Sequence, residues 1–267
     1  MTGGRASVCV SGMLRGGAGW LETCQSEAAY GCVLRLAEVA GKTVLVSGLY
    51  AMEAAVPHQK IWESQLLSSP GNIKSLDFFF PGADLKWRVA FQRRYAYGIE
   101  PEINTDEYPA YIFFALRDLS SKKKDNLPDL FMGHQGLVIV SGTMHDLLRT
   151  FNMGRTRFHE VPLYEYDQKT LRPRRWYFMH IREDRRTLVA EESTGLEPAR
   201  TGKVWFPSMA GDHEIALDPE TAGELDLWLD RSVSSRVFFS DRLKKAIKSS
   251  GLSTRWLGFR PCKIVTV

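Results

Sequence analysis

The chain has 267 residues, of which 44% are hydrophobic, and its 35 basic and 31 acidic residues give a formal net charge of +4. A chain of this size and hydrophobic content can bury one large core or two modest ones, so its folding requires no disulfide or metal. The charge is too balanced to indicate a general nucleic-acid-binding protein. We therefore expect a globular protein in which local charge asymmetry matters more than net charge.

The sequence also carries information about the compartment. Four cysteines, at positions 9, 24, 32 and 262, show neither a Cys-x-x-Cys pair nor a metal-like spacing. The apolar run at residues 6–14 is short and ends at Arg15, so it does not resemble a signal peptide. Residues 44–56, the longest apolar stretch, contain Glu53 and are too short to span a bilayer. These features predict a cytoplasmic protein with reduced thiols, no membrane association, no cofactor and no metal.

The first part of the chain mixes predicted strands and helices. Apolar residues at three- and four-residue spacing predict a helix at residues 26–40, and residues 57–67 predict another, which ends at Ser-Ser-Pro-Gly. Residues 85–92 alternate apolar and polar side chains, which is the period of a half-buried strand. Further strands are predicted at residues 7–14, 43–50 and 110–116.

A lysine-rich connection follows these elements. Residues 120–126 contain Lys122, Lys123 and Lys124 and are typical of a solvated segment. We place a candidate boundary here, between an N-terminal α+β region at 1–125 and a C-terminal α+β region at 126–267. The same stretch is typical of a plain surface loop, in which case the two regions pack as one continuous unit.

Strands dominate the second part of the chain. They are predicted at residues 161–166, 175–181, 187–191, 203–206, 213–218, 225–229 and 262–267. They cluster without regular helical crossovers, which favours an α+β fold of mixed, largely antiparallel sheets with a few short helices.

Two segments share a strand-to-helix pattern. In residues 237–253 the apolar run VFF is followed by Ser240 as a predicted N-cap, a helix with one apolar face, and Gly251 as a left-handed cap. Residues 138–154 repeat the pattern, with Ser141 at the position of Ser240. The match indicates either an internal repeat or two similar β-to-α turns.

The order of these segments resembles the Imm11 family of immunity-type proteins from bacterial polymorphic toxin systems. The segments are PDLF at 128–131, VIVS at 138–141, FHEVPL at 158–163, WYFMHI at 176–181, LWLD at 227–230 and VFFSDRL at 237–243. The resemblance covers roughly residues 75 to 259. The chain departs from the family at Glu160, where Pro is common, and at Leu229, where the family often has Trp-Arg-Asp.

The resemblance implies a non-enzymatic protein that binds and neutralises a cognate toxin encoded by a neighbouring gene. Inhibition would occlude the active site of the toxin or block its assembly. The toxin we expect is an antibacterial nuclease effector secreted by a type VI or similar system, because an acidic protein surface complements the basic cleft of a nuclease. The family supplies no catalytic residues to carry over.

The acidic surface is predicted within residues 204–230, which contain no Lys or Arg. Its candidate toxin-binding residues are Asp212, Glu214, Asp218, Glu220, Glu224, Asp226 and Trp228. The tryptophan would serve as an aromatic anchor. The alternative is that the acids form one solvent-exposed face and the aromatic residue belongs to the core.

Two further hypotheses remain open. A small hydrolase, or an enzyme that reverses toxin damage, would use His134, His145 or His213 with nearby carboxylates, although Leu217 and Asp184 break the zinc-protease patterns. A nucleic-acid-binding protein would use the arginine patch between Arg172 and Arg186, unless internal ion pairs neutralise that patch.

Overall fold

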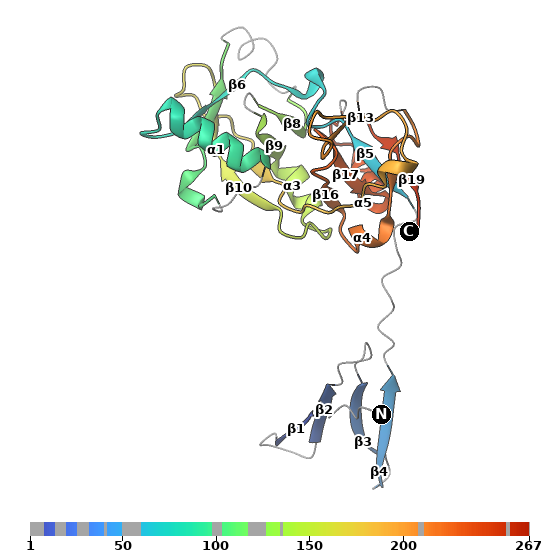
Figure 1. Cartoon of the computed structure of the whole chain (residues 1–267). Coiled ribbons are helices and arrows are strands. Elements are labelled where there is room, and N and C mark those ends of the chain that lie inside the picture. Colours follow the sequence, from blue (N-terminus) through green and yellow to red (C-terminus); the bar gives the residue numbers. More distant parts are fainter. Residues whose placement is uncertain are drawn as a thin grey trace. The chain divides into compact units, whose positions relative to one another are not determined.

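The computed structural model describes residues 8–13, 20–25, 32–39, 42–49, 60–97, 103–116, 127–133, 136–207, 211–254 and 257–266. The chain divides into two compact units, an N-terminal unit at Met1–Val56 and a C-terminal unit at Pro57–Val267 (Figure 1). The candidate boundary near residue 125 falls within residues 117–126, outside the described residues.

The N-terminal unit contains an antiparallel meander in the order β1-β2-β3-β4. Its strands are β1 Val8–Met13, β2 Trp20–Gln25, β3 Cys32–Val39 and β4 Lys42–Leu49. The strands predicted at 7–14 and 43–50 are confirmed. The helix predicted at 26–40 is wrong, because Cys32–Val39 pairs in unbroken register with β4. Pairing along the whole segment outweighs the helical spacing of a few apolar residues.

Two antiparallel four-stranded sheets form the centre of the C-terminal unit. The β12 sheet has the order β10 Arg157–Val161, β12 Trp176–His180, β9 Val138–Ser141 and β8 Leu130–Met132. The β5 sheet has the order β18 Arg260–Pro261, β5 Ile61–Ser64, β17 Val237–Ser240 and β16 Leu227–Leu229. These sheets confirm an α+β fold with largely antiparallel pairing.

Three hydrophobic cores separate the layers of the C-terminal unit. Core 1 lies between the two four-stranded sheets and contains Val140 and Phe239, together with side chains of α3 Gly142–Leu148 and α5 Asp241–Ser249. Alternate residues of the same strands face outward, so that Ile139 enters core 2 and Phe238 enters core 3. Both faces of each sheet are therefore buried, which explains why VIVS and VFFS are continuous apolar runs rather than alternating ones.

Smaller sheets and helices cover the outer cores. Core 2 is closed by the order β11 Leu163–Tyr164, β7 Tyr111–Phe114 and β6 Leu76–Phe79, and by α1 Leu85–Tyr97. Core 3 is closed by β15 Ala216–Leu217 with β19 Lys263–Ile264, and by α4 Pro219–Ala222. The remaining elements are β13 Glu197–Pro198, β14 Trp205–Phe206 and the 3₁₀ turns Pro70–Asn72, Thr105–Glu107 and Ala190–Glu192.

Two predictions near the start of this unit are wrong. The helix predicted at 57–67 contains β5 instead, because Ile61–Ser64 lies between β17 and β18 and pairs with both. The strand predicted at 85–92 is α1, since Trp87, Phe91 and Tyr95 recur every four residues and pack into core 2. Trp87 and Phe91 fit both a two-residue and a four-residue period, which explains the error.

Predictions for the later strands are correct in place but too long. The structure confirms the strands predicted at 110–116, 175–181 and 225–229, which are β7, β12 and β16. Only two-residue strands are found within the segments predicted at 161–166, 203–206, 213–218 and 262–267, and these are β11, β14, β15 and β19. The strand predicted at 187–191 is wrong, since Leu188 forms only an isolated bridge with Leu217 before a 3₁₀ turn at Ala190–Glu192.

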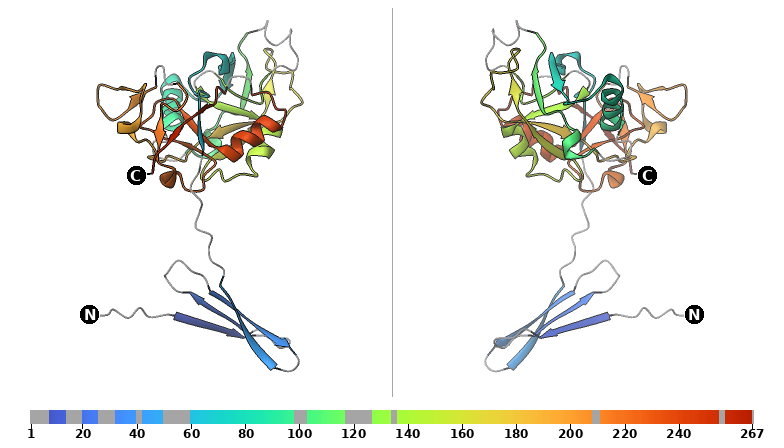
Figure 2. Two further views of the ribbon diagram at one scale, coloured as in Figure 1. Left: turned by 90° about the vertical axis from the view of Figure 1, so that its right-hand side faces the viewer. Right: turned by 90° about the vertical axis from the view of Figure 1, so that its left-hand side faces the viewer.

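Two hairpin–helix motifs occupy equivalent places in the two central sheets. The first is β8–β9–α3 and the second is β16–β17–α5, and α3 and α5 contact each other, as the left view of Figure 2 shows. Both predicted N-caps are confirmed, because Ser141 Oγ accepts from Met144 N and Ser240 Oγ from Leu243 N. Gly251 adopts the predicted left-handed conformation, with φ of 71°. The equivalence extends to β12 and β5, which pair with β9 and β17 in the same register.

The two motifs hold each other through reciprocal hydrogen bonds. Asp129, before β8, accepts from Ser141 Oγ at 2.6 Å and from the backbone N of Ser253, which follows α5, at 2.7 Å. Asp226, before β16, accepts from Ser240 Oγ and from the backbone N of Asn152, which follows α3, at 2.8 Å. Each aspartate therefore fastens its own helix N-cap to the end of the helix of the other motif. We call these two arrangements the aspartate clasps.

Candidate functional site

The exposed acidic residues gather around α4 and β15. Asp212, Glu220 and Glu224 are exposed. Two others have local roles: Asp218 is half-buried and caps α4 by accepting from Glu220 N at 3.0 Å, while Glu214 accepts from Gly211 N at 2.5 Å. The exposed carboxylates of Asp212, Glu220 and Glu224 can face a partner. We call these three residues, together with Glu191, the acidic face.

Sequence reasoning missed Glu191. The backbone bonds Val189 N to Ala216 O and Thr194 N to Glu214 O bring the 3₁₀ turn Ala190–Glu192 beside β15. Glu191 is exposed there, and its neighbour Glu192 pairs with Lys263 at 2.7 Å. No signal in the linear sequence joins this turn to residues 204–230, because the contact depends on β15 folding back along it.

Two of the predicted toxin-binding residues lie inside the fold. Trp228 is 0% exposed in core 3, and Asp226 is 0% exposed within its clasp. Asp226 also receives the guanidinium of Arg242 at 2.6 Å and 2.7 Å. These two side chains support the fold and are not part of the acidic face. For Trp228 this is the alternative stated above, in which the aromatic residue belongs to the core.

The histidines have separate surroundings. His145 is buried on α3, where it stacks on Tyr177 with ring centroids 4.0 Å apart and its Nδ1 lies 2.9 Å from Asp146 Oδ1. His213 is exposed and has a φ of 63°, next to Pro261. His134 lies outside the described residues. Among the residues that the structure describes, no group of three His, Cys, Asp or Glu side chains could hold a metal ion.

Most arginines of the patch between Arg172 and Arg186 form ion pairs within the protein. The pairs are Arg172 with Glu165 at 2.9 Å, Arg174 with Asp129, Arg175 with Asp146 at 2.9 Å, and Arg185 with Glu183 at 3.3 Å. Arg174 and Arg175 also lie over the rings of Trp176 and Tyr177. These contacts compensate much of the positive charge of the patch within the protein.

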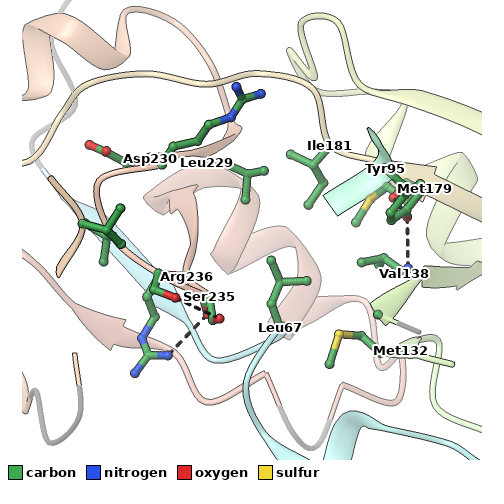
Figure 3. A pocket seen from close by; sticks show the side chains of 15 residues that line it. Leu67, Tyr95, Met132, Val138, Met179, Ile181, Leu229, Asp230, Ser235 and Arg236 are labelled. Carbon is green, nitrogen blue, oxygen red and sulfur yellow. Dashed lines mark hydrogen bonds between the residues drawn. The ribbon is translucent and has the colours of Figure 1, made fainter. Parts of the chain in front are cut away.

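A cleft of about 490 Å³ opens between the two central sheets, at the strand ends remote from α3 and α5. Met132 and Val138 line it from the first motif, and Leu229, Asp230 and the hairpin that leads to Arg236 line it from the second. Figure 3 shows Met132 and Val138 on one side of the cleft and Asp230, Ser235 and Arg236 on the other. The cleft can hold an apolar group of that volume with polar partners along one wall.

A buried ion pair stiffens the polar wall of the cleft. Arg236 donates from Nε to Glu63 at 2.7 Å, and its other nitrogens reach Ser68 Oγ at 2.8 Å and Pro207 O at 2.9 Å. Burial raises the pKa of Glu63 above its usual range, although Arg236 acts in the opposite direction. The guanidinium is therefore committed to the protein itself and leaves little charge for a ligand.

The family comparison identifies the class of protein that this fold belongs to. The model of the immunity protein family Imm11 matches residues 63–263, and the chain belongs to that family. The match begins at Glu63 in β5 and ends at Lys263 in β19, so it spans both central sheets and all three cores. No curated protein matches the chain. None of the helices in the described ranges has the length and hydrophobicity needed to cross a bilayer.

Proposed function

We propose that this protein binds a cognate toxin, encoded by a neighbouring gene, and neutralises it without catalysing a reaction. The observation that carries the proposal is the family match, which extends over the whole central fold. Two features of the molecule support a binding role. Among the described residues, His145 pairs with Asp146 whereas His213 lies beside Pro261, so the two histidines do not share a site. The carboxylates of Asp212, Glu220 and Glu224 are exposed.

We further propose that the toxin is a nuclease, delivered by a type VI or similar secretion system, and that it meets this protein in the cytoplasm. A nuclease binds phosphates through a basic cleft, and an acidic surface complements such a cleft in charge. Glu220 lies in the first turn of α4 and Glu224 directly follows its C-cap, with Asp212 and Glu191 on neighbouring segments. The acidic face would occlude the cleft and speed the encounter of the two proteins.

The test is protection by co-expression. The toxin gene is expressed in a sensitive bacterium with or without this protein, and survival is measured alongside co-purification of the two chains. Survival with a stable complex supports inhibition by binding. Survival without a complex contradicts it and favours an enzyme that reverses the damage, and death in every pairing contradicts an immunity role toward that toxin.

A charge-matched pair of variants tests the acidic face. Glu220→Gln with Glu224→Gln raises the net charge by about two units, and so does the control Thr143→Lys with Ser249→Lys on the exposed sides of α3 and α5. We expect the first variant to weaken binding at least about tenfold, mainly by slowing association, while the control leaves it within about twofold. Equal effects of both variants would show that net charge, rather than this face, guides the complex.

A further inference from the structure

The outer side of α1 is a second surface without a structural role in the described part of the fold. Successive positions at about 100° per residue place Leu85, Val89, Arg93, Lys86 and Ala90 next to one another on one side of the helix. All five are exposed, and Leu85 is 76% exposed, the highest value among the large hydrophobic residues of the described chain. We call these five residues the α1 face.

The opposite side of α1 carries the contacts that hold the helix. Phe91 and Tyr95 are buried in core 2, and Tyr95 Oη donates to Met179 O at 2.7 Å. The two basic residues on this side are also committed, since Arg94 binds Glu107 and the Arg88 guanidinium lies over the Phe80 ring. The exposed residues are therefore not needed to anchor the helix.

The α1 face combines free positive charge with exposed apolar side chains. The helix Leu85–Tyr97 contains four basic residues and no acidic one. Among the residues that the structure describes, neither Lys86 nor Arg93 forms an ion pair. Two uncompensated cations therefore stand beside the apolar pair Leu85 and Val89, which are one helical turn apart.

We propose that the α1 face is a docking surface for a region of the toxin that bears carboxylates around a shallow apolar depression. Leu85 and Val89 fill the depression as anchors one turn apart, in the way that a helix uses residues i and i+4 in a groove. Lys86 and Arg93 pair with the carboxylates at the rim. This contact rests on the proposed function, and it is separate from the acidic face, because α1 packs on core 2 and α4 on core 3.

The chemistry of the face favours a protein over other anionic partners. A nucleic-acid site gains its affinity from many phosphate contacts, on the order of six to ten, whereas this face has two free cations. A membrane-binding helix needs a long apolar stripe, and over residues 85–95 of α1 the exposed apolar side chains are Leu85, Val89 and Ala90 alone. A mixed surface with two apolar anchors and two flanking cations matches the composition of a protein interface.

The experiment measures the affinity of the full-length protein for the purified toxin, in a catalytically inactive form, by calorimetry. Lys86→Glu with Arg93→Glu reverses the charge of the α1 face, and the matched control Arg200→Glu with Lys203→Glu makes the same charge change on an exposed turn. We expect the α1 variant to lose at least about tenfold in affinity and the control less than about twofold. A third variant, Leu85→Ser, keeps the charge and should lose about fivefold at an unchanged thermal midpoint.

The outcomes separate this inference from the proposed function. Wild-type binding that survives charge reversal at α1 overturns the inference and leaves the proposed function standing. No binding by the wild-type protein overturns both. Duplex DNA and vesicles containing phosphatidylserine serve as further probes at about 0.1 M salt, where charges are screened beyond ~10 Å. Binding to either probe that Lys86→Glu with Arg93→Glu abolishes would replace the protein partner with a nucleic acid or a lipid surface.

Discussion

The two hairpin–helix motifs share a backbone design but differ in the contact that joins helix and sheet. In the first motif His145 stacks on Tyr177 of β12 with ring centroids 4.0 Å apart. In the second, the residue at the same distance after the N-cap is Lys244, whose Nζ lies 3.7 Å from the ring centroid of Trp62 in β5. The Asp and Ser of each clasp are the same in both. The comparison shows that the clasp geometry restricts residue type more strongly than the helix-to-sheet contact does.

Chain order is the second difference between the motifs. The central strand β12 follows its motif in the sequence, whereas β5 precedes its motif by more than 160 residues. The two sheets have the same strand order, yet only the segments β8–β9–α3 and β16–β17–α5 follow one another in the same order along the chain. The internal similarity is therefore visible in the sequence only over those segments.

Removing an aspartate clasp should produce the largest effect. The carboxylate of Asp226 accepts hydrogen bonds from Ser240, Asn152 and Arg242. Asp226→Asn replaces one of its two acceptor oxygens with an NH₂ donor, which leaves buried donors without an acceptor. We expect the free energy of unfolding to fall by about 3 kcal/mol. Asp129→Asn, with one hydrogen bond fewer, should cost about 2 kcal/mol. Urea denaturation measures both, with exposed Asp212→Asn as the control. Losses below about 0.5 kcal/mol would show that the clasps contribute little.

The N-cap serines should come next. Ser240→Ala and Ser141→Ala each remove a cap and a donor to the clasp, and we expect a loss of about 1 to 2 kcal/mol for each. A double-mutant cycle between Ser240→Ala and Asp226→Asn should show coupling above about 0.5 kcal/mol, because the two side chains are hydrogen-bonded. Additive losses would mean that capping and clasping act independently.

The helix-to-sheet contacts should have smaller and unequal effects. His145 is 8% exposed, so His145→Ala removes buried ring contacts and should cost about 1 kcal/mol. Lys244 is half-buried, and Lys244→Ala should cost about 0.5 kcal/mol through the lost cation–π contact. Thermal denaturation of the two variants in parallel measures the difference. A larger loss for Lys244→Ala would reverse the order that burial predicts.

The contribution of Asp241 to the pH dependence of stability should be the smallest of these effects. Burial acts to raise the pKa of Asp241, but hydrogen bonds from Lys245 and Trp62 outweigh it and hold that pKa below its ordinary value of 3.8. An acid with a lowered pKa stabilises the folded state fully above about pH 5, and this stability is lost as the pH falls through the folded pKa. Asp241→Asn should therefore flatten the acid limb of the stability profile. An unchanged limb between about pH 2 and pH 5 would show that the shift does not act on folding.

How much the sequence could predict differed along the chain. The capping interactions of Ser240, Ser141 and Gly251 involve residues only three or four positions away in the sequence. These local signals were sufficient to predict the positions of both helices correctly. The segments at 32–39 and 61–64 became strands because distant strands pair with them, and local spacing carries no information about those partners. The acidic residues were identified by their charge, but only the folded chain separates Glu220 and Glu224 on the surface from Asp226 in a clasp. The basic helix α1 was mistaken for a strand, which hid the contiguity of its exposed face.

The position of β5 in the sequence determines when its sheet can form during synthesis. Among the described strands of the C-terminal unit it is the first to leave the ribosome, yet both of its neighbours, β17 and β18, follow it by more than 170 residues. At about 5 to 20 residues per second, Ile61 and its neighbours wait on the order of ten seconds or longer without their final partners. The β5 sheet is thus completed only after β17 and β18 have been synthesised, and a truncated product that ends before β17 lacks the strand that joins β5 to β16.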